Sequence, residues 1–297
     1  MGIESIFLEL TTRCNLSCIK CPNKFFLEKN DINKDILNFI LFKSLKNYSG
    51  KVIVATGEPT LNKNGLVTLH KWSLLNRDRK VIIFTNGTLL HTLSEELLSN
   101  PQITYIVSLD GIRRHTIRKL QPDLNIQVLK SNLQKLRKRN LPTNFFINFT
   151  LHKLIVNEII DIFKFASILH LKELFFTPLL NFYFPNKNLV AKYQLDDIEL
   201  KNLRYKLSNL SKLYRIKIKI GSNNKCKSPR PIFHIDGSVS YCEGTDGLYT
   251  FRIQENILDI IDRSPKPLHM CKTCFKKQQT YFRELPPRLQ KLTNINS

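Results

Sequence analysis

The stretch TTRCNLSCIKCPNK, residues 11–24, carries three of the chain's seven cysteines in the spacing C-x3-C-x2-C. Three thiolates are one too few for a closed tetrahedral metal site and one too many for a single disulfide. The stretch follows IFLEL, residues 6–10, which predicts a first β-strand. We therefore expect Cys14, Cys18 and Cys21 in the loop at the carboxyl end of that strand, where parallel α/β folds build their sites.

Strand-like and helical patterns alternate along the chain. The predicted strands are Ile6–Leu10, Lys51–Thr56, Val81–Thr85, Tyr105–Leu109, Asn144–Leu151 and Glu173–Thr177, and the predicted helices are Lys34–Leu45, Gly65–Leu75, Leu93–Ser99, Ile126–Lys138 and Asn157–Leu169. This order predicts a parallel α/β sheet with right-handed crossovers. After Phe184 the rhythm changes to one helical stretch, Leu195–Leu213, and strand-like pieces at Arg215–Ile220 and Pro231–Tyr241. We place a domain boundary there, between residues 184 and 185.

Clustered thiolates are the ordinary ligands of iron–sulfur clusters. Three thiolates on a four-iron cluster leave one iron without a protein ligand, and that iron can bind a substrate or cofactor. The alternative is a structural zinc site, but such sites usually close with four ligands, and no histidine lies nearby in the sequence.

C-x3-C-x2-C directly after a first strand resembles the signature of the radical S-adenosylmethionine (SAM) enzymes, and the resemblance runs from about Ser5 to Thr177. It implies a partial (β/α)6 TIM-like barrel at residues 1–184. It also implies that Cys14, Cys18 and Cys21 hold a [4Fe-4S] cluster whose open iron is chelated by SAM. Enzymes of this superfamily cleave SAM to a 5′-deoxyadenosyl radical, which abstracts a hydrogen atom from the substrate.

Further motifs fall where the superfamily has them. ATGEPT, residues 55–60, resembles its Gly-Gly-Glu-Pro loop, with Thr56 in place of the first glycine. FTNGTLL, residues 84–90, and VSLDG, residues 107–111, end the third and fourth strands, although NG and DG are also ordinary turn dipeptides. The SAM-binding residues that the resemblance implies are Gly57, Glu58, Pro59, Thr85, Asn86, Ser108, Asp110 and Asn148, with Leu179 as an adenine neighbour.

One residue departs from the superfamily's pattern. The position just before the third cysteine is often aromatic in the family and packs near the adenine, but here it is Lys20. Adenine packing is then expected from elsewhere, with Phe25 and Phe26 as the candidates.

The remaining cysteines lie in the second region. CKSPRPIFHIDGSVSYC, residues 226–242, and MCKTC, residues 270–274, together give C-x10-G-x4-C followed by C-x2-C. This pattern resembles the twitch domain, the short relative of the SPASM domain, and implies a small α+β domain at residues 185–297. Its auxiliary [4Fe-4S] cluster would be held by Cys226, Cys242, Cys271 and Cys274. The same four thiols also suit a zinc ribbon. DGS predicts a hairpin turn.

The seven cysteines are then all assigned, which disfavours an epimerase that returns hydrogen from a free thiol. A fully ligated auxiliary cluster suits electron transfer, so we expect a net oxidation of the substrate. A donor such as flavodoxin or ferredoxin would supply the electron that reduces the SAM-binding cluster. The substrate is either a ribosomally made peptide or a small alcohol such as an aminocyclitol. Because residues 1–5 leave no room for a leader-binding domain, a separate protein would supply one. Glu9, His152 and Tyr183 could accept the proton of an alcohol, but each is more often an ordinary core or rim residue, so no catalytic base is assigned.

The chain of 297 residues has 46 Lys and Arg against 24 Asp and Glu, a net charge of +22. We interpret much of this positive charge as a solvated, lysine-rich surface. The same basic surface would also suit the binding of an acidic leader peptide. We recognise no nucleic-acid-binding motif, no apolar run of the roughly 18 residues that a membrane span needs, and no signal peptide. Many cysteines without an export signal predict a cytoplasmic protein, with neither membrane nor nucleic acid as partner.

Overall fold

The computed structural model describes residues 5–21, 29–139, 144–179, 191–221, 231–241 and 251–252. Several residues singled out above lie outside these ranges: Phe25, Phe26, Tyr183, Cys226, Cys242, Cys271 and Cys274. The three cysteines of the first loop lie within them.

The described residues form one mixed sheet of ten strands, in the order β10-β9-β8-β1-β2-β3-β4-β5-β6-β7. The strands are β1 (Ser5–Leu8), β2 (Lys51–Val54), β3 (Lys80–Thr85), β4 (Ile103–Leu109), β5 (Asn144–Leu151), β6 (Glu173–Pro178), β7 (Lys217–Ile220), β8 (Pro231–Phe233), β9 (Ser238–Tyr241) and β10 (Phe251–Arg252). Every neighbouring pair from β8 to β7 is parallel, and β9 and β10 pair antiparallel. The prediction of an α/β fold with a mostly parallel sheet is confirmed.

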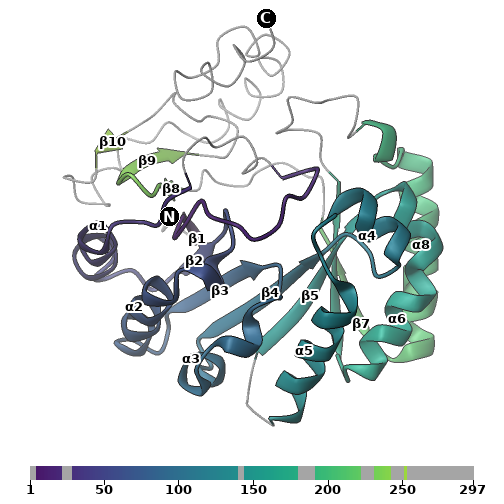
Figure 1. Cartoon of the computed structure of the whole chain (residues 1–297), viewed down its shortest axis with the longest axis horizontal. Coiled ribbons are helices and arrows are strands. Elements are labelled where there is room, and N and C mark those ends of the chain that lie inside the picture. The colour runs from purple at the N-terminus through teal and green to yellow at the C-terminus, as the bar shows by residue number, and fades with distance from the viewer. Residues whose placement is uncertain are drawn as a thin grey trace, which may run out of the picture.

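Helices connect the parallel strands and follow one another along the outside of the sheet (Figure 1). They are α1 (Lys34–Asn38), α2 (Lys63–Leu74), α3 (Glu95–Ser99), α4 (Arg114–Leu120), α5 (Ile126–Lys138), α6 (Ile159–Ile168) and α8 (Asp197–Tyr214). Shorter segments are the π-helical η2 (Phe39–Ser44) and the 3-10 turns η3 (Pro59–Leu61), η4 (Leu90–Thr92) and η5 (Lys153–Glu158). Among the described helices, none has both the length and the apolar composition that a bilayer span requires.

The two faces of the sheet differ because side chains alternate along each strand. On β5, Phe149 is fully buried on the face that the helices cover, and its ring stacks on Phe176 of β6 at 5.9 Å. On the opposite, inner face, Phe146 meets Phe175 edge to face at 5.3 Å, and both rings are partly exposed. The helix-covered face therefore forms the core, and the inner face remains accessible.

The sheet continues beyond the boundary expected at residue 184. The helix α8 leads into β7, which pairs with β6 in parallel, and β8 pairs with β1. The hairpin predicted at DGS is confirmed, because β8 and β9 pair antiparallel around Gly237 at φ 83°. These strands bring the second region alongside the first strand of the sheet.

Candidate functional site

Several of the described residues singled out from the sequence gather at the carboxyl ends of the parallel strands. The cysteines follow β1, Gly57 and Glu58 follow β2, and Asp110 follows β4. Because β1, β2, β3 and β4 are parallel neighbours, the loops at their carboxyl ends lie side by side. The structure thus brings together segments that are up to about a hundred residues apart in the sequence.

Cys14, Cys18 and Cys21 are all partly buried in the loop after β1. The Leu16 N–H donates to Cys14 Sγ at 3.4 Å, and the Cys21 N–H donates to the Cys18 carbonyl at 3.1 Å. Burial raises the pKa of Cys14, and burial together with the charges of Asp110 and Cys21 raises the pKa of Cys18 to about 12. Thiol chemistry and partial burial fit a metal group that displaces the thiol protons when it binds.

No group of three or more His, Cys, Asp or Glu side chains in the described ranges lies close enough to hold one metal ion. That finding concerns a single ion shared by all of its ligands. In a four-iron cluster, each of the three thiolates binds a different iron, so their sulfur atoms need not converge on one point.

Residues between the cysteines anchor their loop to the sheet edge. Asn15 donates to Thr88 Oγ1 at 2.9 Å and accepts from Asn86 Nδ2 at 2.8 Å. The Ser17 hydroxyl donates to Asp123 Oδ2, and the Ser17 N–H donates to the same oxygen at 2.8 Å. The hydroxyl contact and then the N–H contact lower the pKa of Asp123. The sequence analysis missed these anchors, because nothing in the local pattern pairs residues so far apart.

Glu58 joins the loop after β2 to the loop after β3 through hydrogen bonds to its carboxylate. Glu58 is 1% exposed, and its carboxylate accepts four hydrogen bonds. Oε1 accepts from the Thr60 N–H at 3.1 Å, the Thr60 hydroxyl at 2.6 Å and the Thr85 hydroxyl at 2.6 Å, and Oε2 accepts from the Asn86 N–H at 2.6 Å. The side chain of Glu58 therefore positions the two loops, and the carboxylate of Glu58 is directed into the protein.

Gly57 brings the loop after β2 against the cysteine loop. Its φ is +59°, and a Cβ there would lie 2.5 Å from the carbonyl oxygens of both Thr11 and Arg13. The Glu58 N–H donates to the Arg13 carbonyl at 2.7 Å. Thr56, where the family motif has its first glycine, has φ +85° despite its β-branched side chain. Glycine at position 57 is thus required by close backbone approach.

Two further predicted contacts lie on the inner face. Ser108 of β4 and Asn148 of β5 are register partners, and both are partly exposed. Asn148 Oδ1 accepts from the Thr177 hydroxyl at 2.9 Å. Leu179 is 7% exposed and packs with Tyr193 in a small cluster separate from the main core.

Of the candidate bases, His152 is fully buried and both of its ring nitrogens are engaged. Its Nδ1 accepts from the Ile155 N–H at 3.3 Å, so its Nε2 carries the proton and donates to the Asp110 carbonyl at 2.6 Å. Burial lowers the pKa of His152. His152 therefore supports the loop after β4.

Glu9 directly follows β1 on the inner face and forms a buried pair that the sequence analysis missed. Its Oε2 lies 3.1 Å from His234 Nδ1, and both side chains are 8% exposed. The Glu9 N–H donates to the Phe233 carbonyl at 2.9 Å, which extends the β1–β8 pairing to these two residues. The Thr56 hydroxyl approaches Glu9 Oε1 at 3.4 Å.

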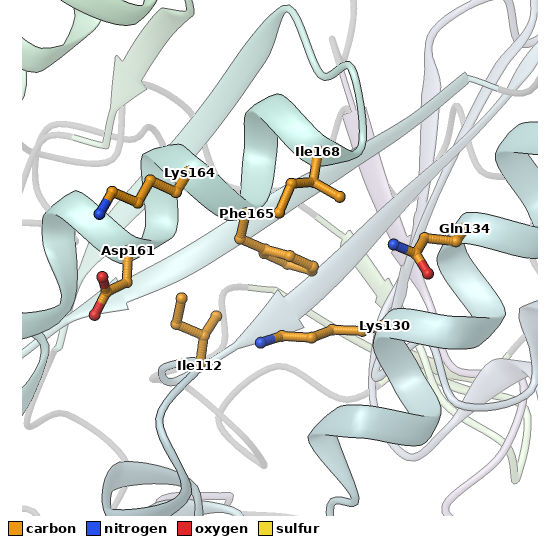
Figure 2. Close-up of a pocket in the computed structure, with 7 residues that line it drawn as sticks. All are labelled: Ile112, Lys130, Gln134, Asp161, Lys164, Phe165 and Ile168. Atoms are coloured by element: carbon orange, nitrogen blue, oxygen red, sulfur yellow. The ribbon is translucent and has the colours of Figure 1, made fainter.

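A pocket lies elsewhere, between α5 and α6 on the helical side of the molecule. Its lining includes Lys130 and Gln134 of α5, Lys164 and Phe165 of α6, and Ile112 (Figure 2). None of the residues predicted to bind a cofactor or metal lines this pocket. The candidate site is therefore the strand edge and not this pocket.

Residues 8–166 match the family model described as the Radical SAM superfamily, and this span is more than half of the chain. The chain therefore belongs to the radical SAM superfamily. Membership implies a [4Fe-4S] cluster and SAM, and the three thiols of the first loop are chemically suited to the cluster.

The chain is 29% identical over 122 residues to GTP 3′,8-cyclase of Clostridium acetobutylicum. The aligned region covers 40% of this chain and 38% of that protein. The chain is also 33% identical over 132 residues to 7-carboxy-7-deazaguanine synthase of Rickettsia prowazekii, which spans 43% of this chain and 52% of that protein. The matched regions thus cover about half or less of these two relatives.

Two solved structures share the fold over most of this chain. Streptococcus suis SuiB bound to S-adenosylmethionine gives a TM-score of 0.71 at 15% identity, covering 90% of this chain and 67% of that one. The enzyme anSMEcpe with bound AdoMet gives a TM-score of 0.70 at 18% identity, covering 91% and 84%. At these identities, the comparison establishes the fold alone.

Proposed function

We propose that this chain is a radical SAM oxidoreductase whose most favoured substrate is a ribosomally made peptide. Cys14, Cys18 and Cys21 would hold the [4Fe-4S] cluster. When bound, the cluster and SAM together supply a 5′-deoxyadenosyl radical that removes a hydrogen atom from the substrate. The observation that carries the proposal is the placement of three partly buried thiols beside the Gly57 loop at the carboxyl edge of a parallel sheet.

The chain's own residues would bind and orient the cofactor. The backbone of Gly57, Glu58 and Pro59 would run alongside the methionine part of SAM, held in place by the buried Glu58 carboxylate. Polar side chains at the ends of the next strands would contact the rest of the molecule. These are Thr85, Asn86, Ser108, Asp110 and Asn148.

We further propose that the sheet is the partial barrel expected of the family and that residues 185–297 form a twitch-like domain. Cys226, Cys242, Cys271 and Cys274 would hold an auxiliary [4Fe-4S] cluster that accepts the substrate's electron. The β8–β9 hairpin supports this arrangement, because β9 ends at Tyr241, one residue before Cys242, and β8 pairs with β1. A zinc ribbon on the same cysteines is the alternative.

The peptide substrate is supported by solved structures of the same fold that contain bound peptides. One structure of SuiB is bound to its precursor peptide SuiA, and one of anSMEcpe holds the Cp18Cys peptide. The net charge of +22 would favour an acidic leader, presented by a separate leader-binding protein. Flavodoxin or ferredoxin would supply the reducing electron.

The second candidate function is dehydrogenation of a small alcohol. The buried Glu9–His234 pair favours it, because such an oxidation needs a group on the inner face that accepts the alcohol proton. Several of the relatives are named GTP 3′,8-cyclase, and GTP is also a small molecule. This candidate therefore stands on an observation independent of the peptide reading.

The test starts from anaerobically reconstituted protein. We expect about seven to eight irons per chain, and release of 5′-deoxyadenosine when SAM and dithionite are added. Cys18→Ala should abolish that release, whereas the neighbouring Leu16→Ala should keep it. Absence of 5′-deoxyadenosine from the unmodified protein would overturn the proposal.

The substrate class needs its own assay. Short peptides encoded beside the gene, an aminocyclitol and GTP are each incubated with the reduced enzyme and SAM, and the products are weighed by mass spectrometry. A loss of two hydrogens from the peptide supports the first candidate. The same loss from the aminocyclitol, reduced strongly by Glu9→Gln, supports the second.

A further inference from the structure

The lysine of the cysteine loop reaches across to the end of β4. Lys20 Nζ forms an ion pair with Asp110 Oδ1 and donates to the Thr150 hydroxyl on β5. The Lys20 side chain is 25% exposed, and the Asp110 side chain is 1% exposed. The Lys20 side chain thus connects the loop after β1 to the carboxyl ends of β4 and β5.

The backbone of Asp110 is held on both sides. Its N–H donates to Gln121 Oε1 at 2.9 Å, and its carbonyl accepts from His152 Nε2 at 2.6 Å. The next residues are fixed as well, because Glu158 Oε2 accepts from the Ile112 N–H at 2.7 Å and the Arg113 N–H at 3.0 Å. The Asp110 carboxylate therefore has a fixed base from which to project.

The second carboxylate oxygen, Asp110 Oδ2, is buried and has no hydrogen-bond partner among the described residues. A buried carboxylate oxygen without a donor is costly, and nearly all buried polar atoms in native proteins have partners. The backbone N–H and carbonyl of Asp110 both have partners, so the unpaired Oδ2 indicates that a ligand supplies the missing donor.

We propose that Lys20 is a positioning residue for cofactor binding. It holds Asp110 Oδ1, so that Oδ2 is directed to accept a hydrogen bond from a hydroxyl or amino donor on the nucleoside part of SAM. This inference rests on the proposed function. It also explains how a lysine serves at a position where the family often has an aromatic side chain: recognition through a hydrogen bond takes the place of packing.

Position favours the cofactor over the substrate as the donor. Lys20 stands between Cys18 and Cys21 and is ion-paired with Asp110, so the Asp110 carboxylate lies beside the proposed cluster loop. If SAM is bound to the cluster held by that loop, its nucleoside part would be within reach of the neighbouring ends of β4 and β5.

The test measures SAM affinity on reconstituted protein, by calorimetry and by titrating the cluster's EPR signal. Lys20→Met keeps most of the side-chain length and removes the ammonium group. We expect at least a tenfold loss of affinity with unchanged iron content, partial recovery in Lys20→Arg, and no loss in the control Lys119→Met on exposed α4. Asp110→Asn should also lose at least tenfold. Because both residues act through one contact, the double variant should bind no more weakly than Asp110→Asn alone.

The outcomes separate this inference from the proposed function. If the cluster of the unmodified protein does not respond to SAM, the proposed function fails. If it responds, but Lys20→Met binds SAM with unchanged affinity and only unfolds more easily, then Lys20 is structural and this inference is overturned. Should Lys20→Met not fold, the double variant, which buries no unpaired charge, is measured instead, and wild-type affinity there overturns the inference.

Discussion

Glu58 and Asn86 lie in different loops, and a 2.6 Å hydrogen bond from the Asn86 N–H to Glu58 Oε2 joins them. The same carboxylate accepts from the hydroxyls of Thr60 and Thr85. Glu58→Gln would turn an acceptor into an NH2 donor facing other donors. We expect it to lower the free energy of unfolding by about 1–3 kcal/mol, measured by urea denaturation. The matched control is Glu95→Gln in the exposed first turn of α3, which should change it by less than about 0.5 kcal/mol.

A result in which Glu58→Gln is as stable as Glu95→Gln would contradict the role of Glu58 in joining the two loops. SAM affinity adds a second reading. We expect SAM affinity to fall as well, because the Glu58 carboxylate positions the two loops that would bind SAM.

Gly57→Ala should disturb the contact between the Gly57 loop and the cysteine loop. The added methyl group would lie 2.5 Å from two carbonyl oxygens, and alanine is strained at φ +59°. We expect a loss of about 1–3 kcal/mol of stability and much weaker SAM binding. Gly221→Ala, whose added methyl group would be 3.6 Å from its nearest neighbour, is the control. Equal behaviour of the two variants would show that the close approach at position 57 is not required.

The pH dependence of stability should report His152. Burial lowers its folded-state pKa below the unfolded value of about 6.5, so the unfolded chain takes up the proton more readily. The protein should therefore lose stability as the pH falls through about 6.5 and level off below the folded-state pKa. His152→Gln, which keeps a donor for the Asp110 carbonyl, should flatten this part of the curve, and exposed His115→Gln should not. An unchanged pH profile in His152→Gln would refute the assignment.

The auxiliary site makes a separate prediction about iron. Replacing Cys271 and Cys274 with alanine should lower the iron content from about eight to about four per chain, while SAM still perturbs the remaining cluster. Substrate oxidation should stop, because the electron acceptor is gone. One zinc and four irons in the unmodified protein would instead support the ribbon, and intact turnover in the double variant would remove the electron-acceptor role.

Elements with long unbroken periodicity were predictable from the sequence. The strand Asn144–Leu151 and the helix Ile126–Lys138 have the predicted bounds, since each buries alternate or helically spaced apolar residues along its whole length. Helix α4, Arg114–Leu120, was missed because its sequence reads as a basic run with only Ile117 and Leu120 as apolar contacts. The predicted helix Lys34–Leu45 is an α-helical turn followed by π-helical η2, a change that local propensity does not encode.

The candidate site divides in the same way. The cysteine spacing, the GEP loop and the DG turn are local patterns that could be found without a structure. The partners that orient them could not, because Ser17–Asp123 and Lys20–Asp110 join residues about a hundred positions apart. Glu9–His234 follows from the register of β1 against β8, which only the assembled sheet reveals.

The most direct test of the central claim is EPR spectroscopy of the oxygen-free, reduced protein with and without SAM. We use the Cys271→Ala, Cys274→Ala variant, so that the signal comes from the cluster on Cys14, Cys18 and Cys21. The account predicts that SAM changes the g-values of that signal, because it binds the iron that the chain leaves without a ligand. A spectrum that is identical with and without SAM would contradict it.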